Sequence, residues 1–587
     1  MATARGAREF QAADYAVMSA MLAVSVGIGV YYSIAGKGQR SSDDFLLAGR
    51  SMRFLPIAIS VLASFFSAST LLGTPAEIYQ YGTQYWISVF GAILAPLTGA
   101  LLFGPLFFKL KIVSVFQYLE MRFSSKAVRL FGAVLFVIRA VLGMGIVLYG
   151  PCTALSAATP VPTWSSIIVV GVVCTLYTFL GGLKAVIWTD VFQTLVMVAG
   201  MLAVLIQAII EVGGMGRMWH LAEEKGRIEF FNFDPDPRVR HTFWTLVVGI
   251  YFVWLPPYTV DQQMVQRFSS ARSLRDAKMA LLFNIPGMFI LITLCSLVGV
   301  ALFATYADCD PLSADVISNP NQLLPLFVVQ MLSFAPGLPG LLFASLFSGA
   351  LSSISSMLNS LAAVTWEDFL KLKFGHLPDE KVTWVTRGLV VLYGVIGVGV
   401  AFLVEQLGGT VLQASLTING AAGAPLVGIF ILGAFFPCIN WIGAIIGGVL
   451  GFSFSMWLII GKYLTKPVDF KLPTSVEGCY FNVSNSNTSV SVWANSSQHL
   501  QGTSLKSDIH HDIIGLEQLY SISYLWFSAI GILSTILVGF LVSVITGLSK
   551  REDIDDNLLL SFPRNSGCYC CKRKMKAYHC QTKDHKT

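Results

Sequence analysis

The chain has 587 residues, of which 55% are hydrophobic and 12% are charged, and its mean hydropathy is +0.67. No soluble core hides that much apolar surface, so the composition excludes a soluble globular protein and indicates a polytopic membrane protein. The net charge of +6 is divided among short loops and the C-terminal tail rather than gathered in one patch. This distribution follows the positive-inside rule and argues against a nucleic-acid partner.

Apolar segments of about 20 residues predict about thirteen membrane-spanning helices, since that length crosses a bilayer. Their centres lie near residues 23, 63, 97, 140, 171, 198, 250, 290, 345, 394, 422, 449 and 535. No cleavage site precedes or follows the first span, so we expect no cleaved signal peptide. The Lys/Arg-rich loops at 36–53, 109–129 and 267–278, with the tail from Lys550, are predicted to be cytoplasmic, which places the N-terminus outside.

Two of the predicted spans are interrupted at comparable places. The second contains a run of hydroxyl-bearing residues and glycine before Pro75, and the seventh contains Pro256 and Pro257 before Tyr258. Because these spans lie five apart, they predict two five-span repeats, each opening with a broken helix whose freed backbone groups can bind ions or substrate. A proline kink with small-residue packing is the alternative that these features leave open.

The predicted organisation has seven parts. They are an extracellular N-terminus with the first helix (1–35), a first repeat (53–211), a second repeat (240–436), span twelve (440–461), a glycosylated extracellular loop (462–522), span thirteen (523–547) and a cytoplasmic tail (548–587). The acceptor sequons of the loop begin at Asn482, Asn487 and Asn495. Cys309 and Cys479 also fall in predicted extracellular loops, where a disulfide can form, although the sequence does not decide whether they pair.

A serine-rich stretch lies in the predicted ninth span. Its hydroxyls belong to Ser348, Ser352, Ser353, Ser355, Ser356 and Ser360. Four of them recur every four residues on one helix face, and Gly349 lies on the neighbouring stripe with Ser353. Lipid offers hydroxyls no partner, so this face either packs against other helices or lines a cation path. Sodium prefers several oxygen ligands, and neutral ones bind it reversibly.

Charged residues inside the predicted spans point to functional sites or buried pairs. Asp190, with Gln193 almost one turn on, is predicted to hold a cation, the alternative being a pair with a base. Asp261 and Arg267 are predicted to form a structural ion pair near the inner end of the seventh span. Glu405 is expected at the outer interface of the tenth.

Arg139 lies at the middle of its span and cannot reach an interface easily. Gly143 is on the same helix face and leaves room beside it. A guanidinium next to such a gap can bind a carboxylate through two hydrogen bonds. A buried pair with Asp190 or Glu405 is an equally weighted alternative.

Features of enzymes are weak in this sequence. All eight histidines lie outside the predicted spans, which argues against an intramembrane metal site, and no P-loop motif is present. We therefore expect no enzyme activity and no cofactor. Any work must be driven by an ion gradient.

Four long stretches carry a resemblance to a known family. They are LGTPAEIYQYGTQYW, GGLKAVIWTDVFQTLVM, DPDPRVRHTFWT and PGLPGLLFASLFSGALSSISSMLNSLAAVTWED. They resemble the sodium:solute symporters, in the branch of the monocarboxylate, multivitamin and iodide carriers. The resemblance implies an all-α, LeuT-like five-plus-five inverted repeat with additional helices in the plasma membrane.

The resemblance also implies a set of site residues. The principal sodium site would use backbone oxygens of Ala63, Phe66 and Gly349 and hydroxyls of Ser352 and Ser353, with Asp190 and Gln193 contributing to a further sodium site. Near the substrate it places Ser67, Ser69, Tyr258, Gln413, Ser415 and Thr417. The sugar-carrying branch has Asn and His where this chain has Phe65 and Thr70, so a sugar is not expected.

Within the anion-carrying branch the chain departs at three positions. Relatives usually have an uncharged residue at Arg139, tyrosine at Gly143 and a bulky apolar residue at Asn419. A more cationic and polar cavity favours an organic anion over a bare halide. We expect sodium-coupled import of a small organic anion, a monocarboxylate or a carboxylate vitamin, by alternating access. An iodide-type symporter and a sodium-dependent sensor are the alternatives, and the sequence does not decide the anion or the stoichiometry.

Overall fold

The computed structural model describes residues 10–35, 42–405, 411–465, 467, 469–479 and 515–560. The first half of the chain forms α1 (Ala12–Ala35), α2 (Ser42–Leu47), α3 (Phe54–Phe65), α4 (Ala68–Tyr81), α5 (Ser88–Thr98), α6 (Gly104–Leu110), α7 (Phe116–Phe123), α8 (Lys126–Ala158), α9 (Thr163–Val212), α10 (Met215–Glu224), α11 (Ile250–Thr259), α12 (Gln262–Ser270) and α13 (Leu274–Thr305). The second half forms α14 (Leu323–Met331), α15 (Leu338–Val364), α16 (Lys371–Phe374), α17 (Asp379–Val404), α18 (Val411–Phe435), α19 (Trp441–Thr465), α20 (Leu516–Tyr520) and α21 (Phe527–Thr546). Short 3-10 and π-helical turns join several of these helices.

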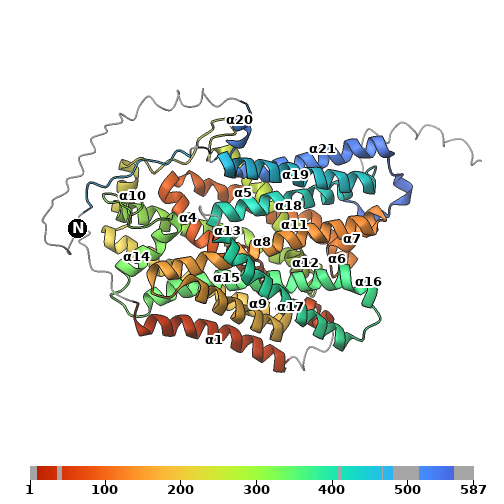
Figure 1. Ribbon diagram of the computed structural model, residues 1–587, viewed down its shortest axis with the longest axis horizontal. Coiled ribbons are helices and arrows are strands. Elements are labelled where there is room, and N and C mark those ends of the chain that lie inside the picture. Colours follow the sequence, from red (N-terminus) through yellow and green to blue (C-terminus); the bar gives the residue numbers. More distant parts are fainter. Residues whose placement is uncertain are drawn as a thin grey trace, which may run out of the picture.

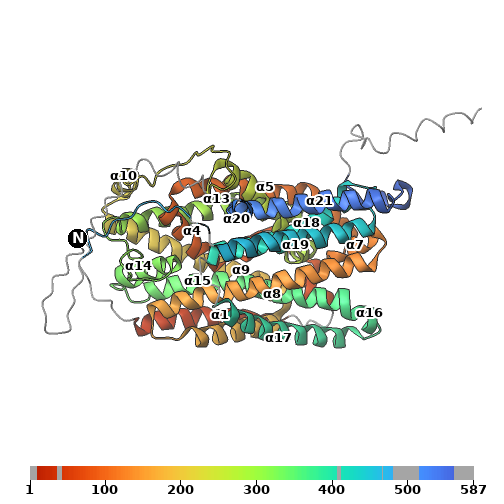
Figure 2. The same cartoon turned by 45° about the horizontal axis from the view of Figure 1, so that its top comes forward.

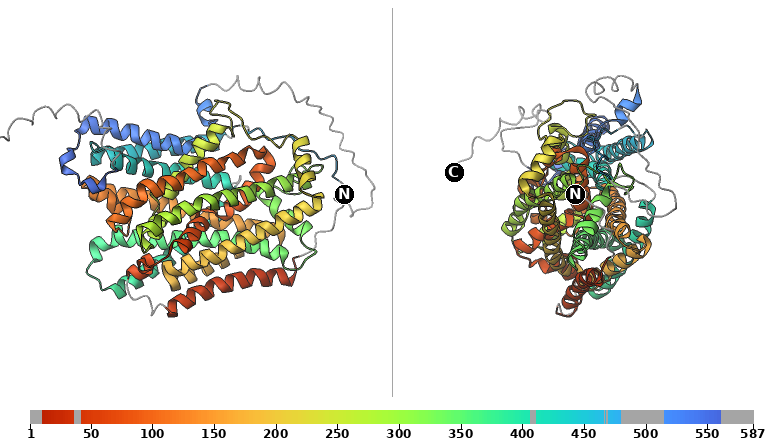
Figure 3. Two further views of the ribbon diagram at one scale, coloured as in Figure 1. Left: turned by 180° about the vertical axis from the view of Figure 1, so that it is seen from behind. Right: turned by 90° about the vertical axis from the view of Figure 1, so that its left-hand side faces the viewer.

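The long helices run side by side along one axis (Figure 1). In this view α1 lies at one edge of the bundle and the pair α19 and α21 at the opposite edge. When the molecule is turned, α17 lies beside α1 at the lower margin and α19 crosses the middle of the bundle (Figure 2). Helix α15 lies inside and packs against α9, α8, α3 and α4. Seen along the bundle, most helices point toward the viewer and α1 is at the margin (Figure 3). The serine-rich helix is therefore enclosed by protein.

Among the described residues, ten helices are long and apolar enough to cross a membrane, or eleven if the bent pair α3 and α4 is one span. This number is smaller than the thirteen predicted from sequence, for two physical reasons. Helix α9 continues for 50 residues through a kink at Gly182, whose φ of 55° and ψ of −160° are not helical, so two predicted spans form one element. The seventh predicted span is divided into a π-helical turn, α11 and α12, each too short by itself.

Both predicted helix breaks are present, but neither lies at a proline. Helices α3 and α4 meet at Phe66 and Ser67 with a bend of 58°, and Pro75 lies inside α4. Pro256 and Pro257 likewise lie inside α11. The second break follows at Asp261, whose carboxylate caps α12 by accepting a hydrogen bond from Gln263 N at 2.8 Å. Ser67 and Asp261, both with extended backbone, begin the helices that follow the breaks, and Asp261 caps its helix through the side chain whereas Ser67 does not.

A disulfide joins Cys309 to Cys479 just after α13, so the pairing that the sequence left open is present. The segment 469–479 also bonds Gln80 at the end of α4, where Leu472 N lies 3.0 Å from Gln80 O. It crosses the end of the bundle that carries α10 and α14 (Figure 1). The three predicted glycosylation sequons lie outside the described residues.

Candidate functional site

Helix α15 approaches the α3–α4 break through Gly349 and Ser353. A Cβ atom at Gly349 would lie only 2.9 Å from Ala68 N, so glycine allows this contact. Ser353 Oγ donates a hydrogen bond to Ser64 O at 2.8 Å. Because α3 ends here, the carbonyls of its last turn lack the usual donors four residues on. The structure thus brings a hydroxyl and free carbonyl oxygens together in a buried place.

The other predicted sodium ligands lie around the same contact. Ala63 and Phe66 are buried on either side of Ser64, at the end of α3. Ser352 is adjacent to Ser353, but its hydroxyl turns toward α9 and donates to Asp190 Oδ1 at 2.6 Å. A hydroxyl that donates to a carboxylate keeps its oxygen lone pairs available for a cation. Neutral oxygens from two helices therefore surround the break.

Asp190 is fully buried on α9 and accepts several hydrogen bonds. Besides Ser352, Ser60 Oγ of α3 donates to Asp190 Oδ2 at 2.5 Å. The guanidinium of Arg267 lies 3.0 Å from the same oxygen. The sequence alternative of a pair with a base is therefore the one found here, and the base is on α12.

Arg267 contacts three helices besides its own. Its Nε donates to Ser60 Oγ at 2.7 Å and its Nη2 to Ser64 Oγ at 2.5 Å, both on α3. It also donates to Ser356 Oγ on α15. A buried guanidinium needs such a set of acceptors because leaving its donors unpaired is costly. Arg267 thus joins the broken span, α9, α12 and α15 beside the predicted sodium site.

The predicted pair of Asp261 with Arg267 is wrong. Asp261 pairs with Arg139 of α8, and Arg139 pairs with neither Asp190 nor Glu405. The reason is that the α11–α12 break places Asp261 in the bundle interior, while α12 turns Arg267 toward α9. The space predicted beside Gly143 admits a further methyl group, because a Cβ atom there would lie 3.6 Å from Met357 Cε, an ordinary van der Waals distance.

The amide nitrogen of Gln193 contacts α1 and not the predicted sodium ligands. Its Nε2 donates to Ser25 Oγ of α1 at 3.3 Å. The same helix is fastened to the start of α15, where Asp14 Oδ1 accepts from Gly337 N at 2.9 Å and from Gly340 N at 3.1 Å. Helix α1, although peripheral, is therefore tied to α9 and α15.

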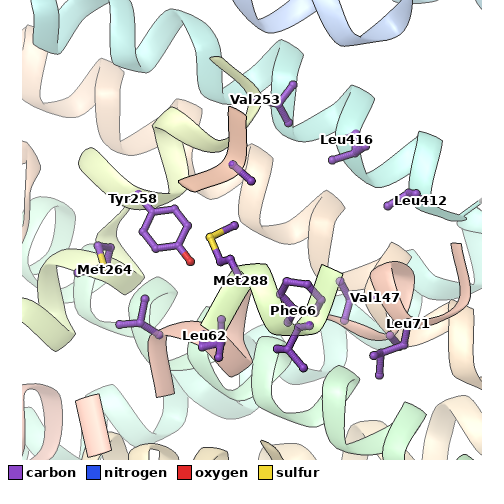
Figure 4. Close-up of a cluster of buried hydrophobic side chains, with 14 of the residues drawn as sticks. Leu62, Phe66, Leu71, Val147, Val253, Tyr258, Met264, Met288, Leu412 and Leu416 are labelled. Atoms are coloured by element: carbon purple, nitrogen blue, oxygen red, sulfur yellow. The ribbon is translucent and has the colours of Figure 1, made fainter. Parts of the chain in front are cut away.

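Tyr258, one of the predicted substrate residues, lies in an apolar cluster with side chains from both broken spans and from α18 (Figure 4). Phe66 and Leu71 reach it from the first break, Tyr258 from α11 and Leu412 and Leu416 from α18 (Figure 4). The hydroxyl of Tyr258 donates to Asn284 Oδ1 at 3.2 Å. Ser67 and Ser69 are buried at the start of α4, and Gln413, Ser415 and Thr417 are half-buried on α18. The side chain of Asn419 is outside the described part of the structure.

A charged cluster that the sequence analysis did not identify lies at the C-terminal end of α4. Arg240 pairs with Glu77 of α4 at 2.7 Å and with Asp469 at 2.8 Å, and its Nη2 lies 3.4 Å from Gln413 Oε1. His241 Nε2 is 3.1 Å from the Glu77 carboxylate. Burial opposes the charge of Arg240, but Glu77 raises its pKa above the ordinary value. The stretch DPDPRVRHTFWT contains both basic residues, yet their acidic partners are distant in sequence.

The sequence is similar to a known family and to characterised relatives over most of its length. The sequence model of the sodium:solute symporter family matches residues 45–451. The chain belongs to this family. Human sodium-coupled monocarboxylate transporter 1 is 42% identical over 570 residues, covering 96% of this chain and 91% of the relative. The human sodium/iodide cotransporter is 41% identical over 556 residues, covering 94% and 86%.

A solved structure shares the fold of this sodium:solute symporter. It is that of a Na+-coupled sialic acid symporter in a substrate-bound outward-open state, with a TM-score of 0.70 and 24% identity. The match covers 92% of this chain and all of the other. The family match and the apolar helices together identify a multi-pass membrane protein, and the family match confirms the family that the sequence resembled.

Proposed function

We propose that this protein imports a small organic anion together with sodium by alternating access. The observation that carries the proposal is the contact of Gly349 and Ser353 with the α3–α4 break, in a chain of the sodium:solute symporter family. A sodium ion bound there joins α15 to the broken span and favours the conformation that completes the substrate site. Sodium and solute then stabilise the same state, which makes their coupling reciprocal.

The sodium ligands are the backbone oxygens of Ala63, Phe66 and Gly349 with the hydroxyls of Ser352 and Ser353. Neutral oxygens suit a cycle in which the ion must leave again. We leave Asp190 out of the ligand set, because Arg267 contacts its carboxylate. Gln193 remains a proposed cation ligand through Oε1, which is buried without a hydrogen-bond partner among the described residues. In this conformation Arg267 supplies the positive charge that a second sodium would otherwise bring.

The solute is a monocarboxylate or a carboxylate vitamin that lies between the two helix breaks. Ser67, Ser69, Tyr258, Gln413, Ser415, Thr417 and Asn419 are the proposed polar contacts. The positive charge of Arg139 attracts the carboxylate of the solute. This carboxylate must compete with Asp261, which already pairs with Arg139. The similarity to a monocarboxylate transporter over 96% of the chain supports this class of anion.

The proposed architecture has two inverted repeats and thirteen spans, counting α9 as two and η4 (Trp244–Gly249), α11 and α12 as one. The N-terminus is outside, the disulfide and the sequons at Asn482, Asn487 and Asn495 are extracellular, and the protein works in the plasma membrane. Net inward movement of positive charge then gains about 2.3 kcal/mol per charge per 100 mV.

Tracer uptake and currents in oocytes test the function. We expect lactate, nicotinate or another carboxylate to enter only when sodium is present. Uptake of iodide alone would move the protein to the halide carriers. Binding of a carboxylate without flux, at normal surface abundance, would support the sensor and contradict symport. Flux without sodium-driven accumulation would indicate a channel.

A further inference from the structure

A second polar contact between α12 and α15 lies one helical turn beyond the contact of Arg267 with Ser356. Gln266 of α12 and Asn359 of α15 are both buried there. Asn359 Nδ2 faces Gln266 Oε1 at 3.5 Å. Neither amide belongs to the sodium or substrate site proposed above. Buried amides inside a membrane protein are costly unless their hydrogen bonds are made.

The hydrogen bonds of these amides are weak or missing. The Asn359 contact and that of Gln266 Nε2 with Leu46 O, at 3.4 Å, are longer than the usual range of about 2.7–3.2 Å. Within the described residues, Asn359 Oδ1 and Gln263 Oε1 have no hydrogen-bond partner. An unpaired buried acceptor costs about 1–3 kcal/mol. A water molecule or a cation can complete such acceptors.

Another buried asparagine shows that this bundle can satisfy an amide fully. Asn284 of α13 donates to Ala280 O at 2.8 Å and to Ala58 O at 3.1 Å, and its Oδ1 accepts from Tyr258. Both asparagines are inaccessible to solvent. Asn284 therefore has a structural role, whereas the oxygen of Asn359 is held without a protein donor.

The position of Asn359 follows a line of oxygens along α15. Ser352 contacts Asp190, Ser356 contacts Arg267 and Asn359 contacts Gln266, each about one turn farther from the sodium site. About two turns later the helix runs into η6 (Thr365–Leu370), which carries Glu367 and Asp368. This end of the bundle is opposite to α10 and α14 (Figure 1). Arg129 pairs with Asp368 and Lys371 with Glu367, so these carboxylates add polar oxygens to the line without a net negative charge.

We propose that Asn359 and Gln266 form a transient binding station for sodium on its release path from the central site to the side where α15 ends. This station rests on the proposed sodium symport. Amide oxygens are suitable ligands for a hard monovalent cation. A cation there lies one turn from the positive charge of Arg267, so it is held weakly and passes on. Only net import requires this release, because sodium can stay bound while solute exchanges across the membrane.

The test compares net uptake with exchange for Asn359→Leu. Net uptake is measured into sodium-free vesicles, and exchange of labelled for unlabelled lactate at saturating sodium on both sides. We expect net uptake to fall at least about fivefold, with exchange unchanged. The matched control Asn284→Leu should lower both together. Asn359→Asp, which leaves a carboxylate at the station, should make internal sodium inhibit net uptake at lower concentration.

The outcomes separate this proposal from the function on which it rests. If the unaltered protein shows no sodium-dependent uptake of any carboxylate, the function fails first. If uptake is normal, equal loss of exchange and net uptake in Asn359→Leu would assign the amide a structural role and overturn the station. Unchanged net uptake would overturn it too. If Asn359→Leu does not reach the surface, Asn359→Asp decides the question. Inhibition of its net uptake by internal sodium at the same concentration as in the unaltered protein would also overturn the station.

Discussion

Two pairs of opposite charges are buried in the described bundle, and each pair joins different helices. Arg267 pairs with Asp190, and Arg139 pairs with Asp261. Removing charges from water is expensive, so each carboxylate requires its base. The central sodium site is then left with neutral oxygens, which bind an ion weakly enough for release. Substitution of a charged residue in a buried pair should therefore affect the protein differently from substitution of a neutral sodium ligand.

Ser353→Ala tests the hydroxyl proposed as a sodium ligand. Loss of one ligand should raise the sodium concentration for half-maximal uptake about 3- to 10-fold, while solute uptake at saturating sodium changes little. Sodium activation of tracer uptake measures this. Ser345→Ala is the matched control, because that hydroxyl bonds Leu342 O of its own helix at 2.7 Å. Identical sodium activation in both variants would remove Ser353 from the site.

Arg139→Gln tests the carboxylate clamp and the buried pair together. The single variant leaves Asp261 buried without its base, which costs about 3–5 kcal/mol and should lower surface abundance. Arg139→Gln with Asp261→Asn removes both charges and should recover abundance. We expect the double variant to bind lactate more weakly, as measured by half-saturation of uptake. Unchanged solute affinity in it would exclude a role of Arg139 in substrate binding.

At the scale of elements, the functional unit is the contact of one straight helix with one broken helix. Helix α3 ends because Phe66 has ψ of 77° and Ser67 is extended, which frees carbonyl oxygens. Helix α15 presents its smallest residue, Gly349, to that break. The site thus depends on the close approach of two backbones rather than on any one side chain.

Gly349→Ala should abolish this approach. A new Cβ atom 2.9 Å from Ala68 N forces the helices apart, so sodium-dependent uptake should fall more than about tenfold at equal surface abundance. The matched control is Gly388→Ala on α17, which gives the same gain in helix propensity. Its new Cβ atom meets nothing within 4 Å, so uptake should stay normal. Normal uptake in Gly349→Ala would show that the close approach is dispensable.

At the scale of the whole molecule, the end of the bundle that carries α10 and α14 is held by contacts between distant parts of the chain. Arg240 joins α4 to Asp469, and the disulfide joins the loop after α13 to Cys479. Arg227, between α10 and η4, donates to Pro473 O at 2.7 Å and to Gln80 O at 3.2 Å. The segment 469–479 therefore holds α4, the second half of the broken span, at its C-terminal end.

Cys309→Ser with Cys479→Ser tests this attachment. The disulfide closes a loop across 170 positions, and its loss should cost about 2–4 kcal/mol. We expect a lower apparent melting temperature of the detergent-solubilised protein and lower surface abundance. The apparent sodium affinity of the protein that reaches the surface should stay unchanged. An unaltered melting temperature would show that the segment is held without the bond.

The sequence by itself determined the membrane class, the family, the two broken spans and the serine-rich face of α15. Hydropathy, helical period and long motifs are local properties, so they can be read along the chain. Only the tertiary structure decided which charges pair: Asp190 with Arg267, Arg139 with Asp261 and Arg240 with Glu77. The two residues of each pair are 77 to 163 positions apart in the sequence. The hydrophobic period of a helix does not fix how that helix is rotated against its neighbours. The pairing follows from where each helix break turns its neighbours, which is a property of the packed bundle.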